Sequence, residues 1–244
     1  MAKRIGLVQT GGIGDIIIAL PIADHFTELG FEVVWPIKEA YMPIFEPIKP
    51  SVRFLPVPPT GSSSVVHEPL RLLNAEACQR TIVLYSYVGG ININDSRLSG
   101  ALKFDEYKYA IAGVPFAKKW DLRYERDMER ENRLYDSLNI SEEYLCFHGL
   151  SADMTEPLRL PGHMSEGLRV IEMEKQSEDE SPFDWLLTLE RAKKLILVDS
   201  CFANLVEQMN LTNPKAVITD NAVAFTPVFR NGWQFLFPDA FKAQ

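Results

Sequence analysis

The sequence predicts an α/β protein whose two halves each carry a parallel β-sheet flanked by helices. Within the first 38 residues it reads as strand, glycine-rich turn, helix and second strand, which is one βαβ unit. A similar alternation of short apolar strands and helices resumes near residue 143. Each half opens with a strand followed by a polar loop. We therefore divide the chain into two domains, residues 1–140 and 141–244.

The expected elements of the first half follow from apolar spacing and from breakers. Residues 5–8 form a strand, and residues 16–29 form a helix with apolar positions at three-residue spacing, Pro21 inside it and Gly30 as its stop. Strands follow at 31–37 and, at a sheet edge, at 52–57. Residues 80–88 read as a buried strand that ends in the polar loop 89–100. Residues 118–138 read as a charged helix.

In the second half, we expect strands at 143–149 and 168–173, with a long polar loop between them. A helix at 183–194, a strand at 195–200, a helix at 201–210 and a strand at 215–219 follow. The aromatic tail from Phe229 onward is expected to dock onto the rest of the chain.

The amino-acid composition indicates which classes of protein the chain can belong to. The chain has 244 residues, 46% hydrophobic and 24% charged, which is typical of a globular protein and not of a disordered one. The net charge of −8 argues against a surface that binds nucleic acid throughout, but it allows a local basic cleft. Cys78, Cys146 and Cys201 have no zinc-site or disulfide spacing, which favours a reducing, cytoplasmic location. We expect neither a signal peptide nor a membrane span.

The turn Gly11-Gly12-Ile13-Gly14-Asp15 stands at the carboxyl end of the first strand, where ligands bind in open α/β sheets. Glycines let a ligand approach backbone N–H groups, and a helix N-terminus favours an anion. The spacing is neither the dinucleotide fingerprint nor a P-loop, which would need Gly-Lys-Ser/Thr. An alternative role for Asp15 is that of a helix N-cap.

The stretch Asp199-Ser200-Cys201 follows a buried strand and opens a helix. A hydroxyl and backbone N–H groups at that point could face a phosphate. The alternative is an Asp/Ser cap with a buried cysteine behind it.

Three stretches together carry a resemblance to a known family. "GDIIIALPIADHF", "EYLCFHGLS" and "LERAKKLILVDSCFANLVEQM" resemble motifs of glycosyltransferase family 9, the lipopolysaccharide heptosyltransferases. The resemblance implies a GT-B-like fold, with two Rossmann-like domains whose parallel sheets face a central cleft. It also implies that residues 1–140 serve the acceptor and residues 141–244 bind the nucleotide sugar. Asp15 falls on the position of the family's proposed catalytic base.

A transfer of this kind needs a carboxylate to take the acceptor's proton and donors to stabilise the leaving diphosphate. We assign the first role to Asp15. The expected binding residues are Gly12, Gly14, Ser151, Asp199, Ser200, Cys201 and Asn204. No Asp-x-Asp motif occurs, which favours a metal-independent reaction with no cofactor besides the nucleotide-sugar substrate. Cys201 stands where the family has glycine, and Asn204 where it has histidine.

Alternative interpretations concern the acceptor molecule and the functional class of the protein. The resemblance favours a cell-surface saccharide as acceptor. A hydroxymethylated DNA base is the alternative, and it would need Arg123, Arg126, Arg130 and Arg133 to form a basic track. Their interleaved acidic residues favour an ion-paired face instead. Other readings are an inactive nucleotide-binding protein, to which Cys201 and Asn204 would point, and a Rossmann-type oxidoreductase, which the glycine spacing disfavours.

Overall fold

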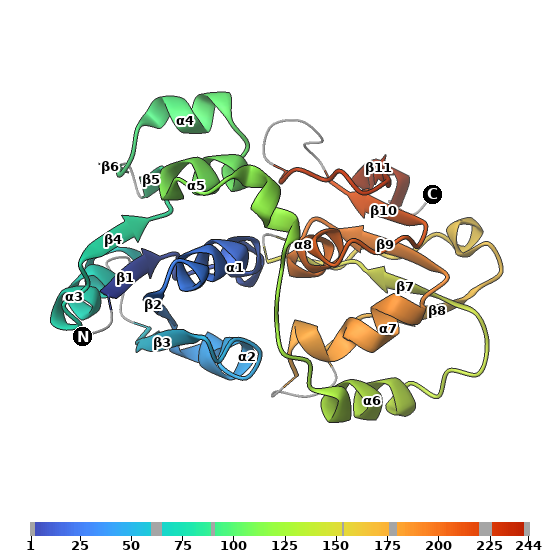
Figure 1. Ribbon diagram of the computed structural model, residues 1–244. Coiled ribbons are helices and arrows are strands. Elements are labelled where there is room, and N and C mark those ends of the chain that lie inside the picture. The colour runs from blue at the N-terminus through green and yellow to red at the C-terminus, as the bar shows by residue number, and fades with distance from the viewer. Residues whose placement is uncertain are drawn as a thin grey trace. The chain divides into compact units, whose positions relative to one another are not determined.

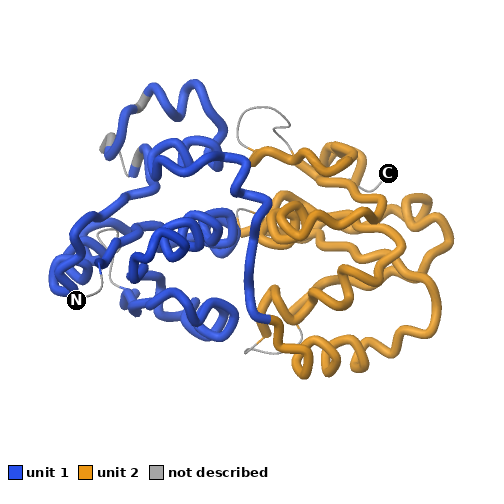
Figure 2. Tube along the Cα trace, viewed as in Figure 1, with its two compact units in different colours: residues 1–125 blue, residues 126–244 orange. Residues whose placement is uncertain are grey.

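A computed structural model describes residues 3–59, 65–88, 91–152, 154–175, 180–219 and 226–241. The chain forms two compact units, residues 1–125 and 126–244, which Figure 2 colours separately. The division therefore falls after residue 125, whereas the sequence analysis places it after residue 140.

Ion pairs explain why the boundary lies earlier than expected. The helix that follows it, α6 (Met128–Ser137), belongs to the second unit. The Arg126 guanidinium pairs with the carboxylates of Glu131 and, at 2.7 Å, of Glu190. The Arg130 guanidinium pairs with Asp184 at 2.7 Å. These contacts join α6 to the second unit's own helices.

The first unit holds a parallel sheet of order β3-β2-β1-β4. Its strands are β1 (Lys3–Val8), β2 (Phe31–Lys38), β3 (Val52–Val57) and β4 (Arg80–Val83). The strands β5 (Tyr87–Val88) and β6 (Ile91–Asn92) form a separate antiparallel pair. Its helices are α1 (Ile13–Glu28), α2 (Met42–Phe45), α3 (His67–Ala75), α4 (Ser96–Ala101) and α5 (Phe104–Ala112), with short 3-10 turns at Glu39–Tyr41 and Phe116–Trp120.

The βαβ unit and the edge strand β3 are confirmed (Figure 1). Helix α1 carries a run of fully buried residues from Ile16 to Ala23, Pro21 among them, and contacts β2 and α5. Helix α3 contacts β1, β2 and β3, and its Leu73 lies so close to Gly6 that a Cβ there would stand 2.7 Å from it. The first sheet is thus held by helices that pack on it through buried apolar side chains.

Two expectations for the first unit are wrong. The buried strand predicted at 80–88 is the four-residue edge strand β4, with the first two residues exposed. The helix predicted at 118–138 is a 3-10 turn, an extended segment and then α6. Backbone bonding explains the second difference, since Glu125 N donates to Ile48 O at 2.9 Å and Lys49 Nζ donates to Arg123 O. Groups that a helix would need internally are bonded elsewhere.

The four arginines consequently do not share one helix face, because only Arg130 and Arg133 lie on α6. Arg123 pairs with Glu28 at 2.6 Å and Arg133 with Glu129 at 2.8 Å. With the pairs of Arg126 and Arg130, every arginine of the set has an acidic partner. The expected ion pairing is confirmed.

The second unit holds a parallel sheet of order β11-β10-β9-β7-β8. Its strands are β7 (Tyr144–His148), β8 (Arg169–Glu172), β9 (Lys194–Val198), β10 (Lys215–Ile218) and β11 (Trp233–Leu236). Besides α6, its helices are α7 (Leu186–Arg191) and α8 (Cys201–Gln208), with 3-10 turns at Gly162–Ser165, Pro182–Trp185 and Pro238–Phe241. The elements expected here are confirmed.

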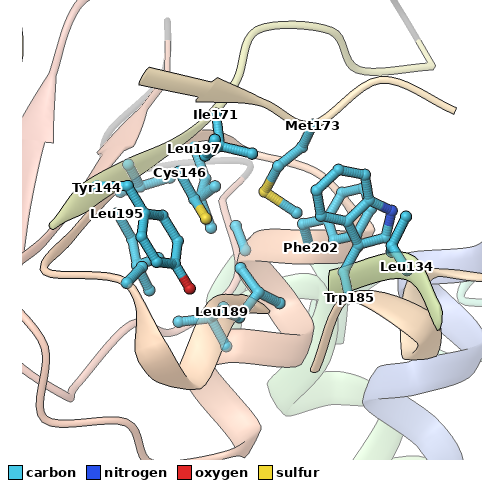
Figure 3. Close-up of a cluster of buried hydrophobic side chains, with 14 residues drawn as sticks. Leu134, Tyr144, Cys146, Ile171, Met173, Trp185, Leu189, Leu195, Leu197 and Phe202 are labelled. Carbon is cyan, nitrogen blue, oxygen red and sulfur yellow. The ribbon is translucent and has the colours of Figure 1, made fainter. Parts of the chain in front are cut away.

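Aromatic and aliphatic side chains from the strands and helices form this unit's core (Figure 3). Trp185 is fully buried and meets the Phe202 ring edge-on, with centroids 6.3 Å apart. The tail docks as expected: β11 extends the sheet beside β10, and Trp233 Nε1 donates to Glu207 Oε2 at 2.7 Å. Helix α8 is therefore fixed to the core on one side and to the tail by Glu207.

Candidate functional site

The strand order of the first sheet locates its ligand-binding edge. From β1 the chain adds β2 and β3 on one side, and β4 pairs with β1 on the other. Such a reversal of strand order marks the place where open α/β sheets bind ligands, outside the carboxyl ends of the two strands. The glycine turn follows β1, and Tyr85 follows β4. Both therefore lie at the first unit's switch point.

The Tyr85 hydroxyl binds the glycine turn. It accepts hydrogen bonds from Thr10 N at 3.0 Å, Gly11 N at 3.2 Å and Gln9 Nε2 at 3.1 Å. Backbone N–H groups at the start of the turn are thus satisfied within the protein. These two N–H groups are therefore not directed at a ligand, and an anion at this turn would have to bind the first N–H groups of α1.

Asp15 lies in the first turn of α1, and the N-cap of the helix is Gly12. Gly12 has φ +76°, and α1 has no side-chain cap hydrogen bond. The alternative that Asp15 is the N-cap is therefore wrong. Its carboxylate pairs instead with Lys108, with Oδ1 3.1 Å from Nζ, and its side chain is 35% exposed. A Cβ on Gly12 would collide with Oδ2. Gly14 forms the same helical turn.

Lys108 of α5 is a site residue that the sequence analysis missed. Its side chain is only 2% exposed, and its Nζ donates to Gln9 Oε1 at 2.8 Å. The ammonium lies 5.7 Å from the Tyr85 ring centroid and 5.4 Å from that of Tyr107, within cation–π range. A signal was available, because Lys108 stands four residues after Phe104 and four before Ala112, on the buried face of the helix. A lysine is rarely buried without a partner.

The second sheet has its own switch point, between β7 and β9. The chain passes from β7 to β8 on one side and adds β9, β10 and β11 on the other. His148 ends β7, and Ser200 follows β9. The two side chains meet, with Ser200 Oγ 3.1 Å from His148 Nδ1. Burial lowers the pKa of the His148 imidazole from 6.5 to about 4, so the ring is neutral at neutral pH.

Ser200 is the N-cap of α8, but its hydroxyl makes no capping bond and is directed to His148 instead. Asn204 Nδ2 donates to Ser200 O at 3.0 Å, so this amide braces the first turn of the helix. The same residue is buried, and its Oδ1 has no hydrogen-bond partner among the described residues. The Asn204 amide carries two N–H donors, so its expected use as a phosphate donor would rely on the N–H that does not bond Ser200 O.

The remaining predicted residues lie around this edge. Asp199 N donates to Ile218 O at 3.0 Å, which ties the end of β9 to β10. Burial raises the pKa of the Cys201 thiol to about 12, so the sulfur is protonated and unreactive at neutral pH. Ser151 lies on the loop after β7, where its carbonyl accepts from Met154 N at 3.1 Å. Ser200 thus has hydrogen-bond contacts with both Asn204 and His148. Ser151 follows His148 by three residues on the loop after β7.

Across the described residues, we find no group of three or more His, Cys, Asp and Glu side chains placed to hold a metal ion. In the same part of the chain, every helix is too short or too polar to cross a membrane.

Comparison with solved structures identifies the fold. The chain is similar to a family 9 glycosyl transferase from Veillonella parvula, with 15% identity and a TM-score of 0.66 over 96% of this chain and 86% of that one. It is also similar to the dodecameric, iron-containing heptosyltransferase TibC of enterotoxigenic Escherichia coli in complex with ADP-D-β-D-heptose. There the identity is 16% and the TM-score 0.58, over 96% of this chain and 63% of TibC. The third is the E. coli ADP-heptose lipopolysaccharide heptosyltransferase II, with 10% identity and a TM-score of 0.55 over 96% and 90% of the two chains.

No protein-family profile matches the sequence, and no curated protein matches it. At these identities the similarity establishes the fold: an α/β chain with two parallel sheets and flanking helices, like that of the GT-B-like glycosyltransferases.

Proposed function

We propose that the protein is a glycosyltransferase that moves a sugar from a nucleotide-diphosphate sugar to a hydroxyl acceptor. The observation that carries the proposal is the partly exposed Asp15 carboxylate, which pairs with the buried Lys108 at the first sheet's switch point. The shared fold of the glycosyltransferases adds to it. The favoured acceptor is a cell-surface saccharide, and the donor requires no further cofactor.

In this proposal the acceptor binds at the first unit and Asp15 acts as general base. As the acceptor oxygen attacks the anomeric carbon, its proton passes to the Asp15 carboxylate and the bond to the diphosphate breaks. The nucleoside diphosphate leaves with the electron pair of that bond. Proton transfer to a positioned carboxylate contributes about 10²–10⁴-fold to such a reaction.

The donor binds at the second unit's switch point, between β7 and β9. The Ser200 hydroxyl and the N-terminus of α8 stabilise the charge on the leaving diphosphate, as backbone N–H groups at a helix start do for anions. Asp199 and Ser151 line the donor site, and the neutral His148 orients the Ser200 hydroxyl. A central cleft and a metal-independent reaction are parts of this proposal.

The test is a panel of ADP-, UDP- and GDP-sugars. Two of the similar structures carry ADP-heptose in their names, so ADP-sugars come first. We expect at least one donor to raise the melting temperature, because a ligand that binds only the folded state stabilises it. We also expect slow release of the nucleoside diphosphate, with water as the acceptor.

Asp15→Asn should slow this release about 10²–10⁴-fold and keep the thermal shift. Asp121→Asn is the matched control, since Asp121 is exposed and its carboxylate pairs with the neighbouring Lys118 at 3.3 Å. If no sugar nucleotide shifts the melting temperature, the protein is not a nucleotide-sugar enzyme. If Asp15→Asn turns over like the wild type, another residue is the base.

A further inference from the structure

We infer that Lys108 is a positioning residue for Asp15, and that it fixes the carboxylate so that Oδ2 is the atom that receives the acceptor's proton. The inference rests on the proposed function, in which Asp15 is the base. It goes further by naming the residue that orients this base and the oxygen that reacts.

The first argument is that Lys108 is itself held in place. Its Nζ lies 3.1 Å from Asp15 Oδ1 and donates to Gln9 Oε1 at 2.8 Å. Gln9 cannot easily turn away, because its Nε2 donates to Gly11 O at 2.8 Å and to the Tyr85 hydroxyl at 3.1 Å. Trp35 Nε1 also donates to Gln9 O, at 3.1 Å. The ammonium is therefore fixed by groups that are fixed in turn.

The second argument is burial. Lys108 is 2% exposed, whereas the Asp15 side chain is 35% exposed. The carboxylate consequently spans the boundary between the protein interior and solvent. Its Oδ1 faces the buried cation, whereas Oδ2 lies beside Gly12. An ion pair with a buried cation is screened less by solvent than an exposed pair, so it favours the orientation in which Oδ1 faces Lys108.

The third argument is the place of Gly12. A Cβ on this residue would collide with Asp15 Oδ2, and Gly12 itself is exposed. The missing side chain thus leaves room beside Oδ2 on the solvent side. A hydroxyl that approaches over Gly12 reaches Oδ2 while Oδ1 stays paired with Lys108. Misplacing a reacting group by about 1 Å can cost about a hundredfold in rate.

The test is a double-mutant cycle on nucleotide release, with the sugar nucleotide that gives the largest thermal shift as substrate and water as acceptor. Lys108→Met keeps the length of the side chain and removes its charge. We expect its kcat to fall about 10–100-fold, with the donor KM and the donor's thermal shift unchanged. Asp15→Asn/Lys108→Met should be no slower than Asp15→Asn alone, because residues that act through one group are not additive.

Lys38→Met is the matched control. Lys38 also lies beside the turn, with Nζ 3.7 Å from where a Cβ on Gly11 would stand, but it is exposed. We expect this variant to keep the wild-type kcat. Gln9→Met is the second probe, for use if Lys108→Met does not fold. It removes the other acceptor of the Lys108 ammonium and should lower kcat in the same non-additive way.

The outcomes separate the inference from the function on which it rests. If Asp15→Asn is strongly slowed while folded Lys108→Met or Gln9→Met turns over like the wild type, the inference is wrong and the proposed base stands. Losses in Lys108→Met and Asp15→Asn that multiply in the double variant also overturn it. If Asp15→Asn is fully active, the assignment of the base itself fails.

Discussion

Ser200 Oγ lies 3.1 Å from His148 Nδ1, and this contact joins the carboxyl ends of β9 and β7 across 52 residues of sequence. The two strands are direct neighbours in the sheet, with His148 opposite Leu197. The pair therefore stands at the second unit's switch point, where parallel sheets bind their ligands.

Acid should weaken the fold through His148. Burial lowers the pKa of its imidazole from 6.5 to about 4, so the unfolded chain takes up the proton first as the pH falls. The stability due to the neutral ring is complete above pH 6.5 and is lost between pH 6.5 and 4. We expect this one group to remove about 2–3 kcal/mol from the free energy of unfolding over that window. Urea denaturation at pH 7, 5.5 and 4 measures it. His148→Gln should show a shallower decline, and an identical decline in both proteins would refute the assignment.

Removing the Ser200 hydroxyl should weaken donor binding more than it weakens the fold. Ser200→Ala loses one hydrogen bond to His148, which typically contributes about 1 kcal/mol. If that hydroxyl also donates to the diphosphate, the donor Kd should rise about tenfold, the equivalent of about 1.4 kcal/mol. Titration calorimetry measures the change. Ser165→Ala is the control, because the Ser165 hydroxyl donates to Gly162 O at 2.7 Å within its own 3-10 turn, outside the proposed donor site. Equal donor affinity in both variants would remove Ser200 from the donor site.

Gly12→Ala should harm both the fold and the reaction. Gly12 has φ +76°, and the added Cβ would collide with the Asp15 carboxylate. Gly30→Ala is a matched control, since Gly30 has φ +83° and nothing within 4 Å of the added Cβ. Both should lose about 1–2 kcal/mol from the left-handed backbone. Only Gly12→Ala should also lose nucleotide release. Denaturation and turnover measured on the same samples check this, and equal turnover would show that the space beside Asp15 Oδ2 is not needed.

The buried pair Lys119–Asp105 should be costly to break from one side. Both side chains are fully buried, and Lys119 Nζ lies 2.7 Å from Asp105 Oδ2. Lys119→Met leaves a buried carboxylate without its cation, which should cost about 3–5 kcal/mol in the free energy of unfolding. Adding Asp105→Leu should recover much of that loss. The exposed pair Arg133–Glu129 provides the contrast, because Arg133→Ala there should cost less than about 1 kcal/mol. A small effect of Lys119→Met would mean that water reaches Asp105.

Much of the fold was predictable because its signals are local. The apolar spacing and Gly30 mark α1, and short apolar runs mark β7, β9 and β10. The predictions that were wrong concern segments whose structure depends on long-range contacts. The segment before α6 is rich in helix formers, but its backbone bonds to Ile48 and receives the Lys49 ammonium instead. Propensity is a weak prior that such tertiary contacts override.

In the candidate site, too, local signals were predictable and long-range contacts were not. Asp15 and Ser200 could be selected from the sequence because each follows an apolar strand and opens a helix. The contacts that hold them could not be predicted. Lys108 meets Asp15, Tyr85 meets the glycine turn and His148 meets Ser200 only through the strand order and the packing of α5 on α1. The helix-cap alternative for Asp15 failed because the preceding Gly12 occupies the cap position.

The distance along the chain between Gln9 and Lys108, 99 residues, has a consequence for the search for relatives. A pattern built on the glycine turn and its aspartate samples only one short window and accepts any chain with a similar corner. The geometry adds a tyrosine 70 positions and a lysine 93 positions after Asp15, both in contact with the turn or its carboxylate. Substitutions at these distant positions should arise together over evolution. A search that requires all of them would separate chains that share the working arrangement from chains that share only the motif.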